Sequence, residues 1–134
     1  MDLSTIDLKT AAAEGIVVKL QHPATGEYIR DDAGDHVSIT VLGKDSEQWQ
    51  ACAKRTNAKN AARYKNKTIP SAALEAALYD ILADCTMCWS EKIEYEGKKL
   101  KCNAENARML YEARNWIAEQ LIEAAADRSS YFLK

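Results

Sequence analysis

Two cysteines in the motif Cys85-x-x-Cys88 are the residues whose type and spacing could most directly do chemistry. A CxxC pair can ligate zinc or exchange disulfides. Zinc would need two further ligands, from Cys52, Cys102 or a histidine, and there is no second CxxC or HxxxH motif. A redox CxxC normally opens a helix, where the dipole lowers the thiol pKa, whereas this pair closes an apolar stretch. We therefore predict that Cys85 and Cys88 are core residues one helical turn apart, with a metal or thiol site as the alternative.

The two histidines are the other candidates for chemistry. His22 and His36 each flank a predicted turn, and no nucleophile or carboxylate cluster joins them at a spacing typical of catalysis. The paired Asp31 and Asp32 lie in one of these turns, and there is no glycine-rich phosphate loop. We expect a protein that is not an enzyme and holds no cofactor or metal.

Composition excludes several classes of protein. The 134 residues are 47% hydrophobic and 28% charged, which is typical of a folded domain and not of a disordered chain. A net charge of −2 gives no overall attraction to nucleic acid or to anionic membranes. The amino terminus does not resemble a signal peptide, and no apolar run reaches the length of a membrane span. We expect one cytosolic domain over residues 1–134, with its cysteines as thiols.

One segment departs from this charge balance. Basic residues run from Lys54 and Arg55 to Lys67, with Tyr64 as the single aromatic residue among them. The simplest interpretation is a solvated helix face. The alternatives are a contact with nucleic acid and a contact with an acidic partner protein.

The patterning of the first third predicts a small antiparallel β-meander over residues 16–42. Alternating apolar residues indicate strands at 16–20, 27–30 and 37–42, separated by turns rich in Pro, Gly and Asp. A short helix over residues 4–14, with Ser4 as its cap, precedes them. Because so few strands are marginal alone, the meander must pack its apolar side against helices.

The rest of the chain has helical periodicity, so we predict an α+β fold that is predominantly helical. The three helices are expected over residues 45–66, 71–89 and 103–127, packed as a bundle behind the meander. Asp45 or Ser46 caps the first and Asn103 the third. The middle helix is the most apolar and should form the centre of the core.

Aromatic and large apolar residues gather near the two ends of the last third of the chain. They exceed what a polar connection and a helix tail require, and aromatic residues are enriched at protein interfaces. We take them as the candidate partner-binding residues, namely Trp89, Ile93, Tyr95, Tyr131, Phe132 and Leu133.

The order of several short motifs resembles the tail assembly chaperones of long-tailed bacteriophages. The similarity covers nearly the whole chain, and the cysteine pair before Trp89 and the Lys101-Cys102 pair depart from it. The motifs are HPATGEYI from His22, VSITVLGKDSEQWQACAKR from Val37, Trp89 itself, EGKKL from Glu96, ENARMLY from Glu105 and WIAEQLIEAAADRSSYF from Trp116.

The resemblance implies a non-catalytic protein that binds the long helical tape measure protein and recruits tail tube subunits. It implies action in the bacterial host cytoplasm and absence from the finished virion. From the charge balance and the lack of an apolar span we expect no contact with nucleic acid or membrane. Self-association of the chain stays open. The first alternative is a generic cytosolic protein-protein interaction module. The second is a small metal or thiol protein that uses Cys85 and Cys88.

Overall fold

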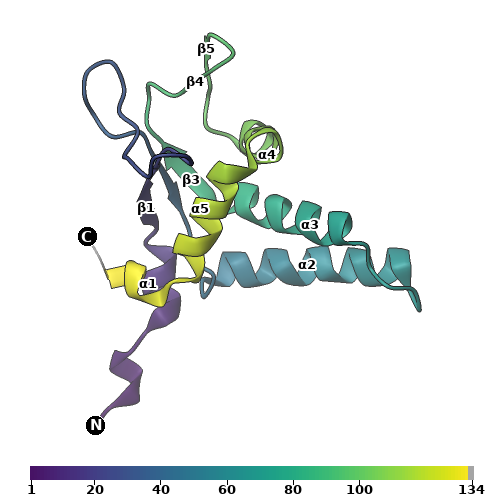
Figure 1. Cartoon of the computed structure of the whole chain (residues 1–134). Coiled ribbons are helices and arrows are strands. Elements are labelled where there is room, and N and C mark those ends of the chain that lie inside the picture. Colours follow the sequence, from purple (N-terminus) through teal and green to yellow (C-terminus); the bar gives the residue numbers. More distant parts are fainter. Residues whose placement is uncertain (133–134) are drawn as a thin grey trace.

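The computed structural model describes residues 1–132 and combines a small antiparallel sheet with several helices (Figure 1). This mixed composition confirms the α+β class at its coarsest level. Among the described residues, no helix is both long and apolar enough to cross a membrane. In chain order the elements are η1 (Leu3–Thr5), α1 (Leu8–Ala13), β1 (Ile16–Lys19), β2 (Ser38–Val41), α2 (Glu47–Tyr64), α3 (Ser71–Asp84), β3 (Thr86–Trp89), β4 (Glu94–Tyr95), β5 (Lys98–Lys99), α4 (Ala104–Ala113), α5 (Asn115–Ala126) and η2 (Arg128–Phe132).

The third strand of the main sheet comes from a segment that the sequence placed in a helix. α3 ends at Asp84 and residues 86–89 pair with β2, so the predicted helix over 71–89 is wrong at its carboxyl end. Thr86 is β-branched and Trp89 aromatic, and both residue types favour strands. The hydroxyl of Thr86 donates to the carbonyl of Leu82 (2.8 Å), which satisfies one acceptor at the helix end. Pairing with the free edge of β2 therefore replaces the last helical turn.

The predicted second strand, residues 27–30, is not a strand of the sheet. β1 and β2 pair directly with each other, and residues 27–30 contribute isolated bridges in the 20–37 loop that joins them. The backbone amide of Leu20 donates to Val37 (2.9 Å), that of Ile29 to Leu20 (2.9 Å) and that of Val37 to Ile29 (3.0 Å). Since the backbones of Leu20 and Val37 already bond to each other, residues 27–30 cannot insert as a strand between β1 and β2. They only add hydrogen bonds at the end of the paired strands.

The predicted amino-terminal helix over residues 4–14 is divided into η1 and α1. Asp7 caps α1 in place of Ser4, because its carboxylate accepts hydrogen bonds from the amide (3.0 Å) and the hydroxyl (2.6 Å) of Thr10.

The predicted helix over residues 103–127 is also two helices. Arg114 leaves the helical conformation (φ −133°, ψ 76°), so α4 and α5 meet at an elbow. Leu110 before the elbow and Ile117 after it are both buried, and α4 packs on α3 while α5 also contacts β1. An apolar stripe continues through such an elbow, so periodicity alone indicated one straight helix.

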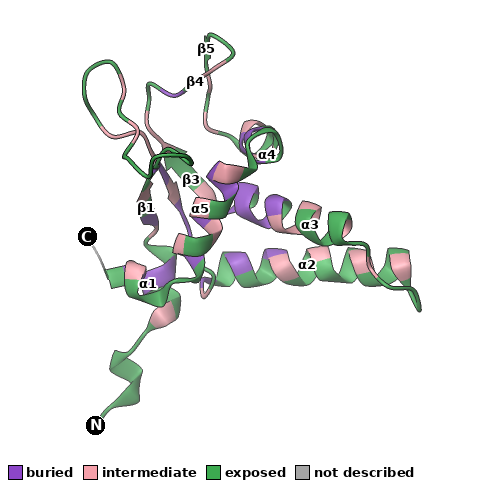
Figure 2. Ribbon diagram, viewed as in Figure 1, coloured by how far each residue is buried: buried purple, intermediate pink, exposed green. Residues whose placement is uncertain are grey.

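α2 and α3 form an antiparallel helical hairpin, called here the arm, that projects from the rest of the molecule (Figure 1). Its base is packed against the body, whereas its outer half is exposed or half-buried (Figure 2). The molecule is thus a sheet with the α4–α5 elbow and a protruding arm, and the expected three-helix bundle is not its arrangement.

Two groups of buried residues hold these parts together. The larger contains Ile39 and Val41 of β2, Leu82 of α3, and residues of both helices of the elbow. The smaller joins α1 to η2 through Ala12 and Tyr131. Near the two ends of the chain, α1 and η2 therefore pack together, and α1 also contacts α2 (Figure 1).

Candidate functional site

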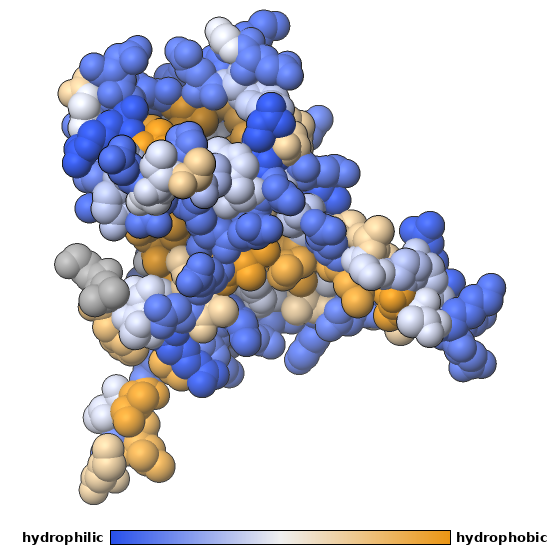
Figure 3. All heavy atoms as spheres, viewed as in Figure 1, coloured by the Kyte–Doolittle hydropathy of each residue, from blue (hydrophilic) through white to orange (hydrophobic). Residues whose placement is uncertain are grey.

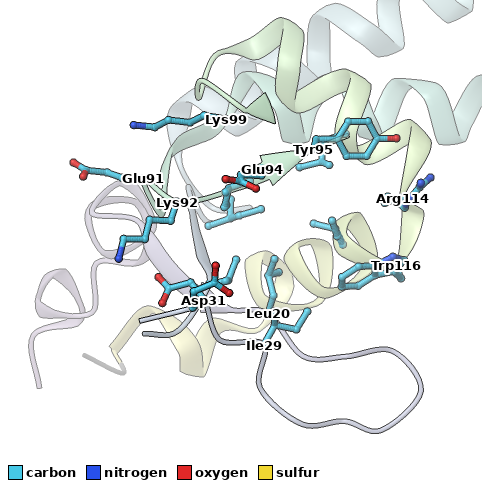
Figure 4. Close-up of a pocket in the computed structure, with 16 residues that line it drawn as sticks. Leu20, Ile29, Asp31, Glu91, Lys92, Glu94, Tyr95, Lys99, Arg114 and Trp116 are labelled. Atoms are coloured by element: carbon cyan, nitrogen blue, oxygen red, sulfur yellow. The ribbon is translucent and has the colours of Figure 1, made fainter. Parts of the chain in front are cut away.

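A hollow of about 710 Å³ opens between the 20–37 loop, the 90–100 segment and the elbow of α4 and α5 (Figure 4). We call it the docking groove. Figure 3 shows an apolar hollow between two charged lobes in this region of the surface. Its floor is apolar and consists of Leu20, Ile29, Val37, Ile39, Leu110 and Ile117.

The floor of the docking groove is continuous with the core. Ile39 is fully buried and Leu20 only 3% exposed, and both belong to the larger group of buried residues. Leu110 reaches the groove from α4 and Ile117 from α5, the two helices of the elbow. Since core packing holds these side chains, the floor is preformed, as binding pockets usually are.

One wall of the groove is the 20–37 loop, which is anchored to α5 by a side chain. The amide of Gln21 donates to Oε1 of Gln120 (2.9 Å), and Nε2 of Gln120 donates back to the carbonyl of Gln21 (2.8 Å). At the loop tip, one carboxylate oxygen of Asp31 accepts from the amides of Ala33 (2.9 Å) and Asp35 (3.0 Å). The loop is thus organised by its own hydrogen bonds, although it contains no strand.

The other wall is the hairpin of β4 and β5. Glu96 and Gly97 at its tip both have positive φ (52° and 80°), which is the conformation of a tight two-residue β-turn. The amide of Leu100 donates to the carbonyl of Ile93 (3.0 Å) below the hairpin. Nε1 of Trp89 donates to the carbonyl of Leu100 (2.9 Å), which ties the hairpin to β3.

The rim of the groove carries charges of both signs. At one end the guanidinium of Arg114 lies 5.4 Å from the ring centroid of Tyr95, a cation-π contact between elbow and hairpin (Figure 4). The rim carboxylates do not form a metal site, since no metal-binding group of three or more His, Cys, Asp or Glu occurs in residues 1–132. The charged residues of the rim are Asp31, Asp32, Glu91, Lys92, Glu94, Lys99 and Arg114.

The first three predicted partner-binding residues lie at or beside this groove. Ile93 (9% exposed) and the half-buried Tyr95 line it. Trp89 is half-buried against the core and supports the hairpin from behind. Trp89 therefore holds the hairpin wall in place and does not line the groove itself.

The other three predicted residues lie elsewhere. Tyr131 is 2% exposed, and its hydroxyl donates to the carbonyl of Ala125 (2.8 Å) and contacts a carboxylate oxygen of Asp45 (3.0 Å). Phe132 is 62% exposed, and Leu133 falls outside the described residues. Tyr131 thus packs in the smaller group of buried residues, and the structure does not bring the two predicted ends into one surface.

Sequence reasoning missed most of the groove. The loop wall was read as two turns and a strand, and Arg114 and Trp116 were assigned to a continuous helix. Ile29 was the available signal, because it is a large apolar residue in an otherwise polar loop. Its partners across the groove come from distant segments and leave no local pattern.

The cysteine pair is divided by the end of α3. Cys85 is 1% exposed, and burial raises the pKa of its thiol to about 12, so its assignment to the core is confirmed. Cys88 is exposed and pairs with Thr40 on the outer face of the sheet, so its assignment to the core was wrong. The prediction assumed that Cys85 and Cys88 lie one helical turn apart on the same face. Residues 86–89 form a strand instead, so the two side chains no longer share a face.

The histidines lie at different positions of the 20–37 loop. Nδ1 of His22 accepts a hydrogen bond from the amide of Ala24 (3.1 Å). His36 packs edge-to-face on Tyr28 (ring centroids 5.3 Å apart), and burial lowers its pKa. Both rings therefore interact with other residues of the same loop.

No protein-family model matches the chain, and searches of curated proteins and of solved structures likewise find no significant match.

Proposed function

We propose that the protein is a non-catalytic binding protein whose docking groove takes up an apolar segment of a partner protein. The observation that carries the proposal is the docking groove itself, with its preformed apolar floor and charged rim. Its volume of about 710 Å³ suits several large side chains from one partner segment. Apolar burial would supply affinity, and the rim charges would orient the segment.

The resemblance to tail assembly chaperones specifies the partner within this proposal. A tape measure protein is long, helical and apolar along its length, and it needs a cover before the tail is complete. The docking groove would hold one apolar stretch of it in the host cytoplasm, and recruitment of tail tube subunits would use other surfaces. Several copies of the chain bound along the partner would keep it soluble.

The alternative, a generic interaction module, uses the same groove with a different partner. Co-expression separates the two: we expect a tape measure protein encoded beside this chain to gain solubility and to elute with it on a sizing column. No gain in solubility and no complex would overturn the chaperone assignment.

A pair of single variants tests the groove. Ile29→Asp places a carboxylate on the apolar floor, whereas Val17→Asp makes the same kind of change at a side chain that is 61% exposed outside the groove. We expect Ile29→Asp to abolish the complex and Val17→Asp to leave it intact, with both proteins folded by circular dichroism. Equal binding by the two variants would place the interface elsewhere.

A further inference from the structure

The arm carries a concentrated positive charge. Six of the 18 basic residues lie between residues 54 and 67, a stretch that contains no acidic residue, although the whole chain has a net charge of −2. All six side chains belong to exposed residues. Residues 54–67 are therefore strongly basic, and the rest of the molecule is correspondingly acidic.

Part of this charge borders a second hollow. A cavity of about 510 Å³, called here the arm groove, runs between α2 and α3. Arg55, Lys59 and Arg63 follow one another at four-residue steps along α2, so they form one ridge beside it. The facing ridge on α3 consists of small side chains in its outer part, at Ala73, Ala76 and Ala77.

The charges at the two ends of the arm groove differ in their partners. At the inner end, Arg55 pairs with Asp84 (3.5 Å), and Asp80 pairs with Arg108 of α4 (2.6 Å). Farther out, Lys59 forms no ion pair within residues 1–132, and Arg63 only lies over the ring of its neighbour Tyr64. Lys59 and Arg63 therefore carry positive charge that no carboxylate of the described residues pairs with.

The outer arm is also poorly covered. From Ala53 to Leu78 no residue is buried, and Leu74 is 53% exposed (Figure 2). There α2 faces α3 with polar side chains, and the hydroxyl of Thr56 bonds back to the carbonyl of Cys52 (3.1 Å). Two helices alone bury little surface, and a third helix against such a pair is the usual way to complete a core.

We infer that the arm groove binds an acidic amphipathic helix of another protein. Carboxylates at four-residue steps on that helix would face Lys59 and Arg63. Its small or apolar face would lie against Ala73 and Ala77, where the short side chains allow close approach of the two backbones. This surface is separate from the docking groove, so the inference does not depend on the function proposed above.

An acidic protein fits the arm groove better than nucleic acid does. Phosphates recur along a whole duplex and would also meet Asp80 and Asp84 at the inner end, whereas a protein helix can carry its carboxylates opposite Lys59 and Arg63 alone. Bases would also need an aromatic ring to stack on. Tyr64 is the aromatic residue of the basic segment, and the guanidinium of Arg63 already lies over its ring (5.3 Å to the centroid).

Titration of the full chain with designed peptides tests the inference. The probe is a helix of about 20 residues built from Ala, Leu and Glu, with glutamates at four-residue steps. A peptide with lysine in place of each glutamate and a duplex DNA of similar length are the comparisons. We expect the acidic peptide to bind, with affinity that falls as salt rises, and the other two to bind at least about tenfold more weakly.

Matched charge reversals locate the surface. The double variant Lys59→Glu with Arg63→Glu should lose at least about tenfold in affinity for the acidic peptide. Lys98→Glu with Lys101→Glu makes the same charge change outside both grooves and should keep the parent affinity. Equal loss in both double variants, no binding of the acidic peptide at low salt, or preferred binding of DNA would overturn the inference. All four substituted side chains of the double variants belong to exposed residues, so melting curves should match the parent.

Discussion

The side-chain amide of Gln120 satisfies both backbone groups of Gln21, accepting from its N–H (2.9 Å) and donating to its carbonyl (2.8 Å). A side chain of α5 thus takes the place of a neighbouring strand at the point where the chain leaves β1 and enters the 20–37 loop. The two residues are 99 positions apart in the sequence. This pair sets the position of one wall of the docking groove.

Replacement of Gln120 should therefore loosen that wall. Gln120→Leu removes both hydrogen bonds, and we expect a loss of about 1–2 kcal/mol in the free energy of unfolding. Faster proteolysis within the 20–37 loop should accompany it. Gln120→Glu keeps an acceptor for the amide of Gln21 but loses the donor, so its effect should be intermediate. Glu119→Gln is the control on the exposed neighbour; unchanged proteolysis in Gln120→Leu would contradict this role.

The contact between Arg128 of η2 and Asp45, just before α2, should make the free energy of unfolding depend on pH. The hydrogen bonds from Arg128 lower the pKa of the Asp45 carboxyl, with a further contribution from Tyr131. A carboxyl whose pKa is depressed by folding stabilises the protein above its unfolded pKa, and this contribution is lost as the pH falls through the folded value. Because the Arg128 side chain is 64% exposed, we expect less than about 1 kcal/mol.

Unfolding experiments between about pH 6 and pH 2 check this expectation. The parent should lose more stability over that interval than Asp45→Asn, whose side chain does not titrate. Parallel profiles for the two proteins would show that the carboxyl does not contribute.

Thr86 and Tyr111 share a partly buried hydrogen bond, and we expect replacement of the two residues to have unequal effects. Their hydroxyl oxygens lie 2.6 Å apart, and Thr86 also donates to the carbonyl of Leu82 (2.8 Å). Tyr111→Phe leaves Thr86 bonded to Leu82 and should cost about 1 kcal/mol. Thr86→Val leaves the hydroxyl of the fully buried Tyr111 without its partner and should cost about 1–3 kcal/mol. Denaturant unfolding measures both; an equal or reversed order would contradict the assignment.

The four cysteines should differ in their reactivity towards thiol reagents. Cys88 is exposed on β3, whereas Cys52 and Cys85 are buried and their burial raises the thiol pKa. Alkylation at pH 8 followed by mass spectrometry should label Cys88 first and the half-buried Cys102 more slowly. Cys52 and Cys85 should react only after unfolding, so their rapid labelling in the native protein would contradict the packing of α3.

Sequence signals that act within a few residues predicted the structure well. Ser46 caps α2 through the amide of Trp49 (3.2 Å), and Asn103 caps α4 through the amide of Asn106 (2.7 Å), as expected from their types. β1 was identified by its alternation. Caps and periodicity are local properties, so the residues that form them lie side by side in the sequence.

What only the tertiary structure decided depends on contacts between distant segments. Residues 86–89 became a strand because β2 had a free edge, and the stripe around Arg114 could have continued straight or bent without changing its periodicity. The docking groove needs Ile29, Ile93 and Ile117 from three separate parts of the chain. The sequence by itself determined the helical segments, β1 and β2, and the apolar character of Ile93 and Tyr95. Long-range strand pairing and the elbow, which no local pattern records, brought these residues to one groove and left Tyr131 in another part of the core.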